Sequence, residues 1–466
     1  MITVLNRPTI ELIPIVIDYD KNVNDKPTVD FHAENLGKYP NTYIDGVQIE
    51  SDAIRIMKLY NNSVTPSVEM EFTDKTGRIV DENFPIDGSI LSLFINANNE
   101  NLMPIRMDFK IYDFYIIKGN VNNDSLFYRI KAYLNVNELL LINFKAYKGS
   151  SFDVLKGISK DVKLGFASNI DKTEDSMTWV NGSDYIINFI NQIVSHSYIN
   201  DDTFLFGYVD FYYNYNYIDI EKALQDDISE QTMVTDRTKV LKDGKEDILP
   251  LTLSNHPDKK STGMYISKYT IDNKTTRTNI EQQYNKFIGV YDMVNKKYND
   301  YMVDTISDTG TDDKIILKGN GVDDFLLKEQ VQHDWSAKFD VDNVHKNYLY
   351  AEYTNFQNLL FLQKLKMIIV LDKPNFNLYR FQKVNVELYN FGKSDQKSQS
   401  TGDQRIDDPN KTVDQYENKI INKLSGEWLI TSINYTFSNK DGNKQEITLI
   451  KRELTSKYVF KNKNNK

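Results

Sequence analysis

The residues of this sequence that could carry catalytic or metal chemistry are few, and their spacing does not suit it. The five histidines are His32, His196, His256, His333 and His345, and no two are spaced as in a His-x-x-x-His metal site. Cysteine is absent, which excludes disulfides, thiolate metal sites and cysteine nucleophiles. A Ser-His-Asp triad needs a serine activated by a histidine. The sequence has no Gly-x-Ser-x-Gly motif, and we expect His196 to be an ordinary surface or helix-end residue.

Two short motifs resemble binding loops but lack essential residues. Lys318–Asp323 contains a Gly-x-Gly without the third glycine of a dinucleotide fingerprint, so it indicates a turn. Asp20–Asp25 resembles the first half of a calcium loop. However, Asp25 replaces the required glycine and Phe31 replaces the bidentate glutamate, so we expect a solvated loop.

Paired carboxylates are the remaining candidates for acid–base chemistry. They are Asp312-Asp313, Asp323-Asp324 and Asp407-Asp408. A glycosidase needs two carboxyl groups about 5–10 Å apart. Among 66 acidic residues chance pairs are expected, and adjacent residues rarely converge on one substrate. We therefore predict no catalytic, cofactor-binding or metal site, no cofactor and no enzymatic activity.

The most unusual composition is the aromatic run from Phe204 to Tyr217. It is typical of a buried strand whose tyrosine hydroxyls find partners at one edge. Alternatively, Tyr212 to Tyr217 packs against another subunit, because tyrosine is enriched at interface cores. Carbohydrate stacking is a third interpretation.

Charge and length restrict the class of protein. The net charge is 56 − 66 = −10, which argues against general affinity for nucleic acid. No stretch reaches the roughly 20 apolar residues of a membrane span, and the first 17 residues do not have the pattern of a signal peptide. A length of 466 residues suggests about three domains.

The elements around these residues fall into three regions. Residues 1–148 alternate apolar and polar residues between turn signals such as Asp45-Gly46 and Asp87-Gly88, which predicts a small β-barrel or sandwich. The predicted strands include 67–72, 90–95, 109–117 and 126–134.

Residues 149–244 predict an α/β domain. Ser150 or Ser151 starts one helix, which ends at Leu164 with Gly165 just beyond it. A second helix runs from Ser183 or Asp184 to His196, and a strand follows over 203–213. We expect Trp179 to be buried against the Phe189 face of the second helix.

Residues 245–275 and 346–458 predict a second β-rich domain. Its strands are 248–253, 264–271, 366–371 and 380–389, followed by a hairpin over 427–454 that turns at Asp441-Gly442. Ile447 and Leu449 face one side of its last strand, and Ile450 and Leu454 face the other. We expect residues 226–250 to be a linker, 276–345 an insertion packing with the α/β domain, 391–422 an exposed loop and 459–466 a polar tail.

Several of these stretches, in this order, resemble the baseplate hub protein of T-even-type contractile-tailed phages. That family is related to the late-control-D tail hubs and to the hub half of type VI secretion spikes. The stretches are 163–169, 173–180, 185–196, 206–221, 424–433 and 447–454, about a quarter of the chain.

The resemblance implies a mainly β fold with an α+β insert: two small β-barrel domains of the tail-hub type, flanking and interleaved with an α/β domain. It implies a homotrimer that adapts a three-fold central spike to a six-fold tail tube and forms part of the DNA ejection channel. The implied partners are the spike, tail tube or tube-initiator proteins, and baseplate wedge and tape-measure proteins. The implied location is the tail baseplate of the virion, assembled in the host cytoplasm. The competing hypothesis is a carbohydrate-binding or peptidoglycan-degrading tail component.

Overall fold

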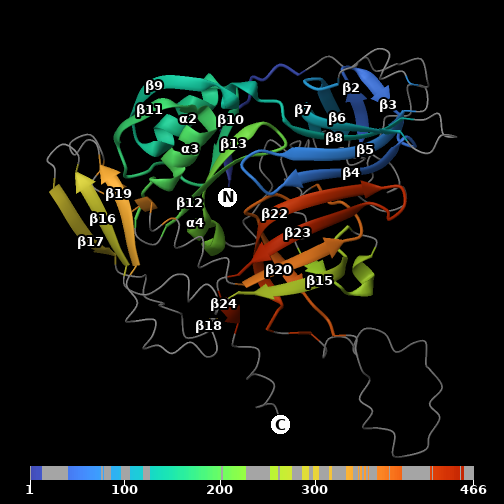
Figure 1. Ribbon diagram of the computed structural model, residues 1–466. Helices are drawn as coiled ribbons and strands as arrows, with labels where there is room; N and C mark the ends of the chain where they lie inside the picture. Colours follow the sequence, from blue (N-terminus) through green and yellow to red (C-terminus); the bar gives the residue numbers. More distant parts are fainter. Residues whose placement is uncertain are drawn as a thin grey trace, which may run out of the picture.

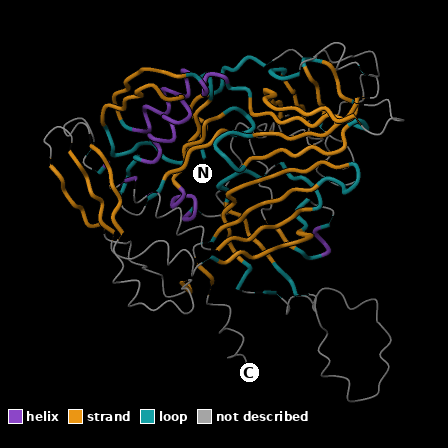
Figure 2. Tube along the Cα trace, viewed as in Figure 1, coloured by secondary structure: helices purple, strands orange, loops and turns teal. Residues whose placement is uncertain are grey.

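The protein is mainly β, as a computed structural model shows (Figure 1). The structure describes residues 2–12, 40–74, 77, 86–95, 105–118, 126–200, 203–226, 252–260, 263–274, 286–292, 297–303, 314–316, 332–338, 345, 347–348, 351–352, 355, 365–376, 378–390, 420–421, 423–451 and 453–455. Within these residues the α-helices between 151 and 225 gather in one unit, beside a large sheet (Figure 2).

The largest element is a 13-stranded sheet. Its main path runs β15-β20-β23-β22-β4-β5-β8-β7-β6-β2-β3, and β21 and β14 branch from β22. The first half contributes β2 (Asn41–Ile44), β3 (Val47–Ile49), β4 (Ile54–Asn61), β5 (Ser67–Asp74), β6 (Ile90–Ile95), β7 (Ile105–Lys118) and β8 (Leu126–Leu134). The second half contributes β14 (Thr252–Ser254), β15 (Ile266–Asn273), β20 (Leu365–Leu371), β21 (Lys383–Glu387), β22 (Gly426–Ser438) and β23 (Lys444–Ile450).

A seam between β4 and β22 joins the two halves. The strands pair antiparallel from Ile433 opposite Asn61 to Ser438 opposite Ile56. Seven strands come from one predicted β-rich region and six from the other, which gives 7 + 6 = 13. The sequence predicts both regions, and the structure places them side by side in one sheet.

Alternating burial explains why these segments are strands. In β5 the residues Val68, Met70 and Phe72 are buried while their neighbours are half-exposed, the period of two that puts one face on a core. The predicted C-terminal hairpin is confirmed, with Gly442 at a φ of 72° in its turn. Ile447 and Leu449 enter the main core, whereas Ile450 joins a second cluster, so this strand is covered on both sides as its pattern predicts.

The α/β unit is built on a four-stranded sheet of order β1-β10-β13-β12. Its elements are β1 (Thr3–Asn6), α2 (Ser151–Asp161), β10 (Gly165–Ser168), α3 (Ile186–Ser195), β12 (Leu205–Val209), β13 (Asn214–Asp219) and α4 (Ile220–Gln225). Ser150 caps α2 as predicted, because its side chain accepts a hydrogen bond from the Asp153 amide. A 3-10 turn, η1 (Asn137–Leu140), leads into this unit.

Two local predictions in this unit are wrong. Gly165 does not end the helix: Lys163 takes the left-handed backbone angle instead, at a φ of 63°. Gly165 opens β10, where a Cβ would collide with the Asn214 side chain and lie 2.8 Å from the Asn6 carbonyl oxygen. The predicted strand over 203–213 is in fact β12 and a turn, and Tyr213 adopts a φ of 60° before β13.

Three smaller sheets complete the described structure. β9 (Ile142–Gly149) and β11 (Met177–Tyr185) form a two-stranded ribbon. β16 (Lys286–Asp292), β17 (Lys297–Val303) and β19 (Gln332–Lys338) form a three-stranded sheet, and β18 (Lys314–Ile316) pairs β24 (Glu453–Thr455). The predicted linker, almost all of the 391–422 loop and the polar tail lie outside the described residues. In the part that the structure describes, no helix is long and apolar enough to span a membrane.

Candidate functional site

The residues weighed as sites in the sequence do not converge in the described structure. The calcium-like loop, the Gly-x-Gly turn and all three carboxylate pairs lie outside the described residues. Of the histidines, His196 and His345 come together, and His256 lies elsewhere, at the start of the 3-10 turn η3 (Pro257–Lys259). The described ranges hold no group of three or more His, Asp or Glu side chains that could bind a metal ion.

The aromatic run lies inside its own chain. Tyr213, Tyr215 and Tyr217 are buried, and the Tyr217 hydroxyl lies 3.1 Å from the Ser151 hydroxyl. The first interpretation is confirmed for burial, but the expected partners are incomplete, because the buried Tyr215 hydroxyl has no hydrogen-bond partner among the described residues. The alternatives of a subunit contact at Tyr212–Tyr217 and of a sugar-stacking surface do not fit these three buried side chains.

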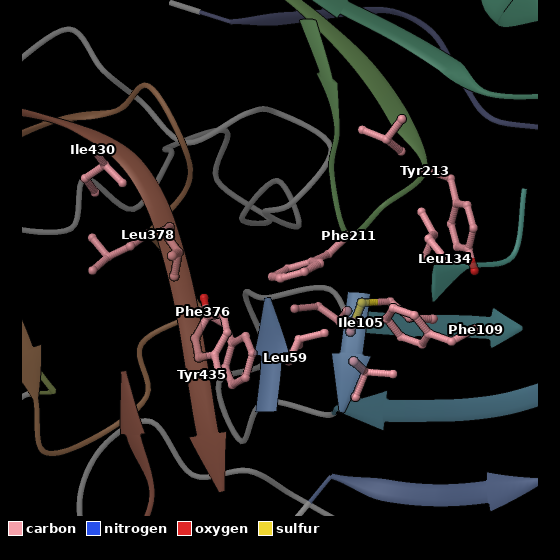
Figure 3. Close-up of a cluster of buried hydrophobic side chains, with 14 of the residues drawn as sticks. Leu59, Ile105, Phe109, Leu134, Phe211, Tyr213, Phe376, Leu378, Ile430 and Tyr435 are labelled. Atoms are coloured by element: carbon pink, nitrogen blue, oxygen red, sulfur yellow. The ribbon is translucent and has the colours of Figure 1, made fainter. Parts of the chain in front are cut away.

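Instead, the α/β unit contacts both halves of the large sheet through buried side chains. We call this contact region the joint. The turn between β12 and β13 carries Phe211 and Tyr213 into the core (Figure 3). The Tyr213 hydroxyl accepts a 2.8 Å hydrogen bond from the Asp108 amide on β7. Phe211 packs 5.9 Å from Tyr435 on β22, which stacks on Phe376 at 4.4 Å.

Arg380 is the second part of the joint. It is 3% exposed, and its guanidinium lies over the rings of Phe206, Tyr208 and Phe381 at 4.6–5.5 Å. It donates to the carbonyls of Thr431 at 2.8 Å and Ser63 at 2.6 Å.

Arg380 is charged and contacts several segments of the chain at once. Burial lowers the pKa of Arg380 to about 10, so the group is charged at neutral pH. One side chain thereby connects β12, β22 and the loop before β5.

The third part of the joint lies at the carboxyl end of α3, where the α/β unit contacts residues 345, 348 and 355, outside the strands of the large sheet. The last carbonyl groups of a helix have no hydrogen-bond donors within the helix. At the end of α3 the donor comes from a segment distant in sequence. The Asn355 amide donates to the carbonyls of Ser195 and Ser197 at 3.0 and 2.9 Å. Its oxygen accepts a 3.3 Å hydrogen bond from the Leu205 amide.

Aromatic rings close the same helix end. His196 stacks on Tyr348, with ring centroids 3.7 Å apart, and its Nδ1 lies 3.0 Å from the Tyr348 carbonyl. The Nε2 of His345 lies 3.0 Å from the His196 carbonyl. Trp179 is buried as predicted, with His345 and Tyr348 as ring neighbours, whereas Phe189 stacks on Tyr147.

Because His196 and His345 are buried in the joint, we expect the stability of the folded chain to fall at acidic pH. Burial lowers the pKa of both His196 and His345, although Glu352, 3.7 Å from His196, opposes the shift. The unfolded chain takes up protons near pH 6.5, before the folded chain does. Stability is therefore fully present above about pH 6.5 and falls as the pH drops through the lowered pKa values. Thermal unfolding between pH 7.5 and 5.5 measures this loss.

A substitution isolates the contribution of the histidines to that slope. His345→Phe keeps a ring beside Tyr348 but cannot take a proton, so we expect a shallower loss of stability over the same pH range. An unchanged slope in both His345→Phe and His196→Gln would assign the acid sensitivity to other groups.

Sequence reasoning missed the residues that form this joint. Arg380 and Asn355 carry no motif, and His345 is 149 residues from its partner His196. The feature of the sequence that pointed to this region was the aromatic run 204–217, because so many aromatic residues together indicate a large buried contact.

The site and fold define a class: a mainly β protein whose curled sheet is locked to an α/β unit by buried aromatic and polar contacts. No protein-family model and no curated protein matches the chain. Among solved structures, it is similar to the 43 kDa tail protein of prophage MuSo2 from Shewanella oneidensis, with 8% identity, a TM-score of 0.49 and coverage of 88% of this chain and 98% of that one.

Two further solved structures resemble the chain. One is a tail protein from Neisseria meningitidis, at 9% identity, a TM-score of 0.46 and coverage of 88% and 95%. The other is an E. coli component of the type VI secretion system, at 8% identity, a TM-score of 0.41 and coverage of 88% and 76%.

Proposed function

We propose that this chain is a non-enzymatic structural hub of a contractile phage tail baseplate. Three copies form a ring between a three-fold central spike and a six-fold tail tube, around a channel that DNA crosses during ejection. The observation that carries the proposal is the β4–β22 seam, which sets two β-rich halves of seven and six strands side by side in one chain.

The seam supplies the symmetry argument. If each half is one quasi-equivalent barrel-like module, three chains present six modules to the tube while keeping three-fold symmetry toward the spike. The domain limits that we propose are 1–148 and 245–275 with 346–458 for the two modules, and 149–244 for the α/β domain, to whose sheet the first segment adds β1. Residues 276–345 are an insertion that packs with the α/β domain.

The joint supplies the mechanical argument. A hub must transmit load between spike and tube without changing shape. Arg380 and the Phe211–Tyr435–Phe376 stack fasten the α/β unit to the sheet through buried groups. Closely packed interiors of this kind transmit strain.

Oligomeric state tests the proposal. We expect light scattering to give the mass of a trimer, either for the isolated chain or after addition of the central spike protein, because closed cyclic rings bury surface without open growth. Monomer under both conditions would contradict the hub. A peptidoglycan digestion assay tests the competing hypothesis, since hydrolysis lost on changing one or two carboxylates would replace the structural role by an enzymatic one.

A further inference from the structure

The β9–β11 ribbon has an outer face of exposed apolar side chains. We define the ribbon face as Leu141, Ile142, Phe144, Val180 and Tyr185. Phe144 is 78% exposed, and the other four are between 47% and 59% exposed. The strand register places Ile142 opposite Tyr185, Phe144 opposite Gly182 and Val180 opposite Ala146, so these four apolar side chains lie on one side of the ribbon. Leu141 immediately precedes β9 and is exposed beside them in sequence.

The inner face of the ribbon is already used by its own chain. Trp179 and Asn181 are buried there, and the Trp179 indole donates to the Gly149 carbonyl at 3.1 Å. The Leu141 carbonyl accepts a 3.0 Å hydrogen bond from the Ile186 amide at the start of α3. The ribbon is therefore held in place, and its apolar side points outward in the folded chain.

A strained bulge contributes to this face. Ser183 has a φ of 98°, in the region that favours glycine. The Asn181 side chain holds the bulge by donating to the Asp184 carbonyl at 3.0 Å and accepting from the Asp184 amide at 2.9 Å. Ser183 is the extra residue between Gly182, opposite Phe144, and Asp184, opposite Asn143. If the same strand continued without a bulge, Tyr185 would lie on the inner face, because successive side chains alternate between the two faces. The chain holds strain here, and Tyr185 lies beside Ile142 as a result.

The surface suits a permanent apolar partner. Five large side chains, each about half exposed or more, approach on the order of the ~800 Å² that one partner contributes to a standard interface. Among the outward positions of the paired strands, Lys148 is charged and the others are not. A Cβ at Gly182 would meet no atom within 4 Å, so the position opposite Phe144 is open to a partner's side chain.

We propose that the ribbon face is the surface by which one copy of this chain packs on the next in a closed ring. This rests on the proposed trimer and names the surface that forms it. A second copy fits because the exposed apolar area approaches what one partner contributes to a standard interface, and a contiguous exposed apolar patch marks a protein–protein contact. In a three-fold ring each contact is between two different patches, so the ribbon face meets another surface of its neighbour.

The test replaces the most exposed side chain. In Phe144→Asp a carboxylate enters the interface without a partner, and we expect association to weaken by at least about 100-fold, as at a hot spot. Circular dichroism and the melting temperature of the monomer should not change. Lys268→Asp, at an exposed position of β15, which is an edge strand of the main sheet and not part of the ribbon, is the control and should remain a trimer.

Site-specific crosslinking gives a second readout that does not depend on the aspartate variant folding. The chain has no cysteine, so Phe144→Cys carries its only thiol. With a thiol-linked photo-crosslinker, copies should join at two and three times the chain mass, and Lys268→Cys should not join.

The outcomes separate the two proposals. A wild-type trimer that persists in Phe144→Asp, with no crosslinks at position 144, overturns the ribbon interface and leaves the hub intact. Crosslinks that appear only to an added spike protein also overturn it. A wild-type monomer with and without the spike overturns both.

Discussion

Replacing Trp179 by alanine is expected to lower the free energy of unfolding by about 3–5 kcal/mol, the range for deleting a buried tryptophan. The indole is 2% exposed and touches the ring pair His345–Tyr348 that closes the end of α3. Its loss leaves a cavity between β11 and the segment around residue 345, and leaves the Gly149 carbonyl without the indole donor. Denaturant unfolding followed by far-UV circular dichroism measures the change.

Trp179→Phe separates packing from hydrogen bonding. Phenylalanine keeps most of the ring volume but not the N–H, so we expect a loss of about 1–2 kcal/mol, mainly from the unpaired carbonyl. If Trp179→Ala unfolds at nearly the wild-type denaturant concentration, the indole is not a core residue and the joint at α3 is wrong.

Replacing Arg380 by alanine is expected to cost a similar amount, about 3–5 kcal/mol. The change leaves two partly buried carbonyls, of Ser63 and Thr431, without their donor, and each costs up to about 1–3 kcal/mol, the range for a fully buried group. It also removes the cation held over three aromatic rings. Because these rings and carbonyls belong to different parts of the chain, the α/β unit should loosen from the sheet. Hydrogen exchange of β12 amides should accelerate along with the loss of stability.

The control for Arg380→Ala is the same substitution at an exposed arginine that also lies over an aromatic ring. Arg55 lies 5.8 Å from the Phe127 ring, but its side chain is 72% exposed, so Arg55→Ala should change stability by less than about 1 kcal/mol. Arg380→Lys should be intermediate, because an ammonium keeps the charge but not the planar fork. Equal effects of Arg380→Ala and Arg55→Ala would show that burial of the guanidinium is not what holds the joint.

Local patterns predicted most elements of this fold. Alternation located β5, β6, β8 and β20 to within a few residues, and the Ser150 cap and apolar stripes located α2 and α3. These signals act over a few residues, so the sequence displays them directly. The aromatic run was correctly interpreted as buried structure, but its division at Tyr213 was not predicted, since a tyrosine at a φ of 60° carries no turn signature.

The sequence did not predict which segments distant along the chain pair or contact each other. Nothing near Ile56 or Ser438 says that β4 and β22 pair, because a strand edge accepts any strand of suitable register. Likewise Asn355 resembles any polar residue until α3 is placed beside it. The β9–β11 ribbon was missed because β11 does not alternate apolar and polar residues, so nothing local marks it as the partner of β9, which does alternate over 142–146.

The β4–β22 seam also has a consequence for the order of events during synthesis. Asn61 pairs with Ile433, a separation of 433 − 61 = 372 residues. At about 5–20 residues per second a ribosome needs on the order of 20–75 s to make that interval. For that time β4 is an unpaired strand edge, which is a template for pairing with the wrong chain. Nascent chains on one message emerge close together, each with the same open edge. The productive fold thus depends on how long the first half remains unpaired on the ribosome, and slower translation of the last hundred residues should favour aggregation over assembly.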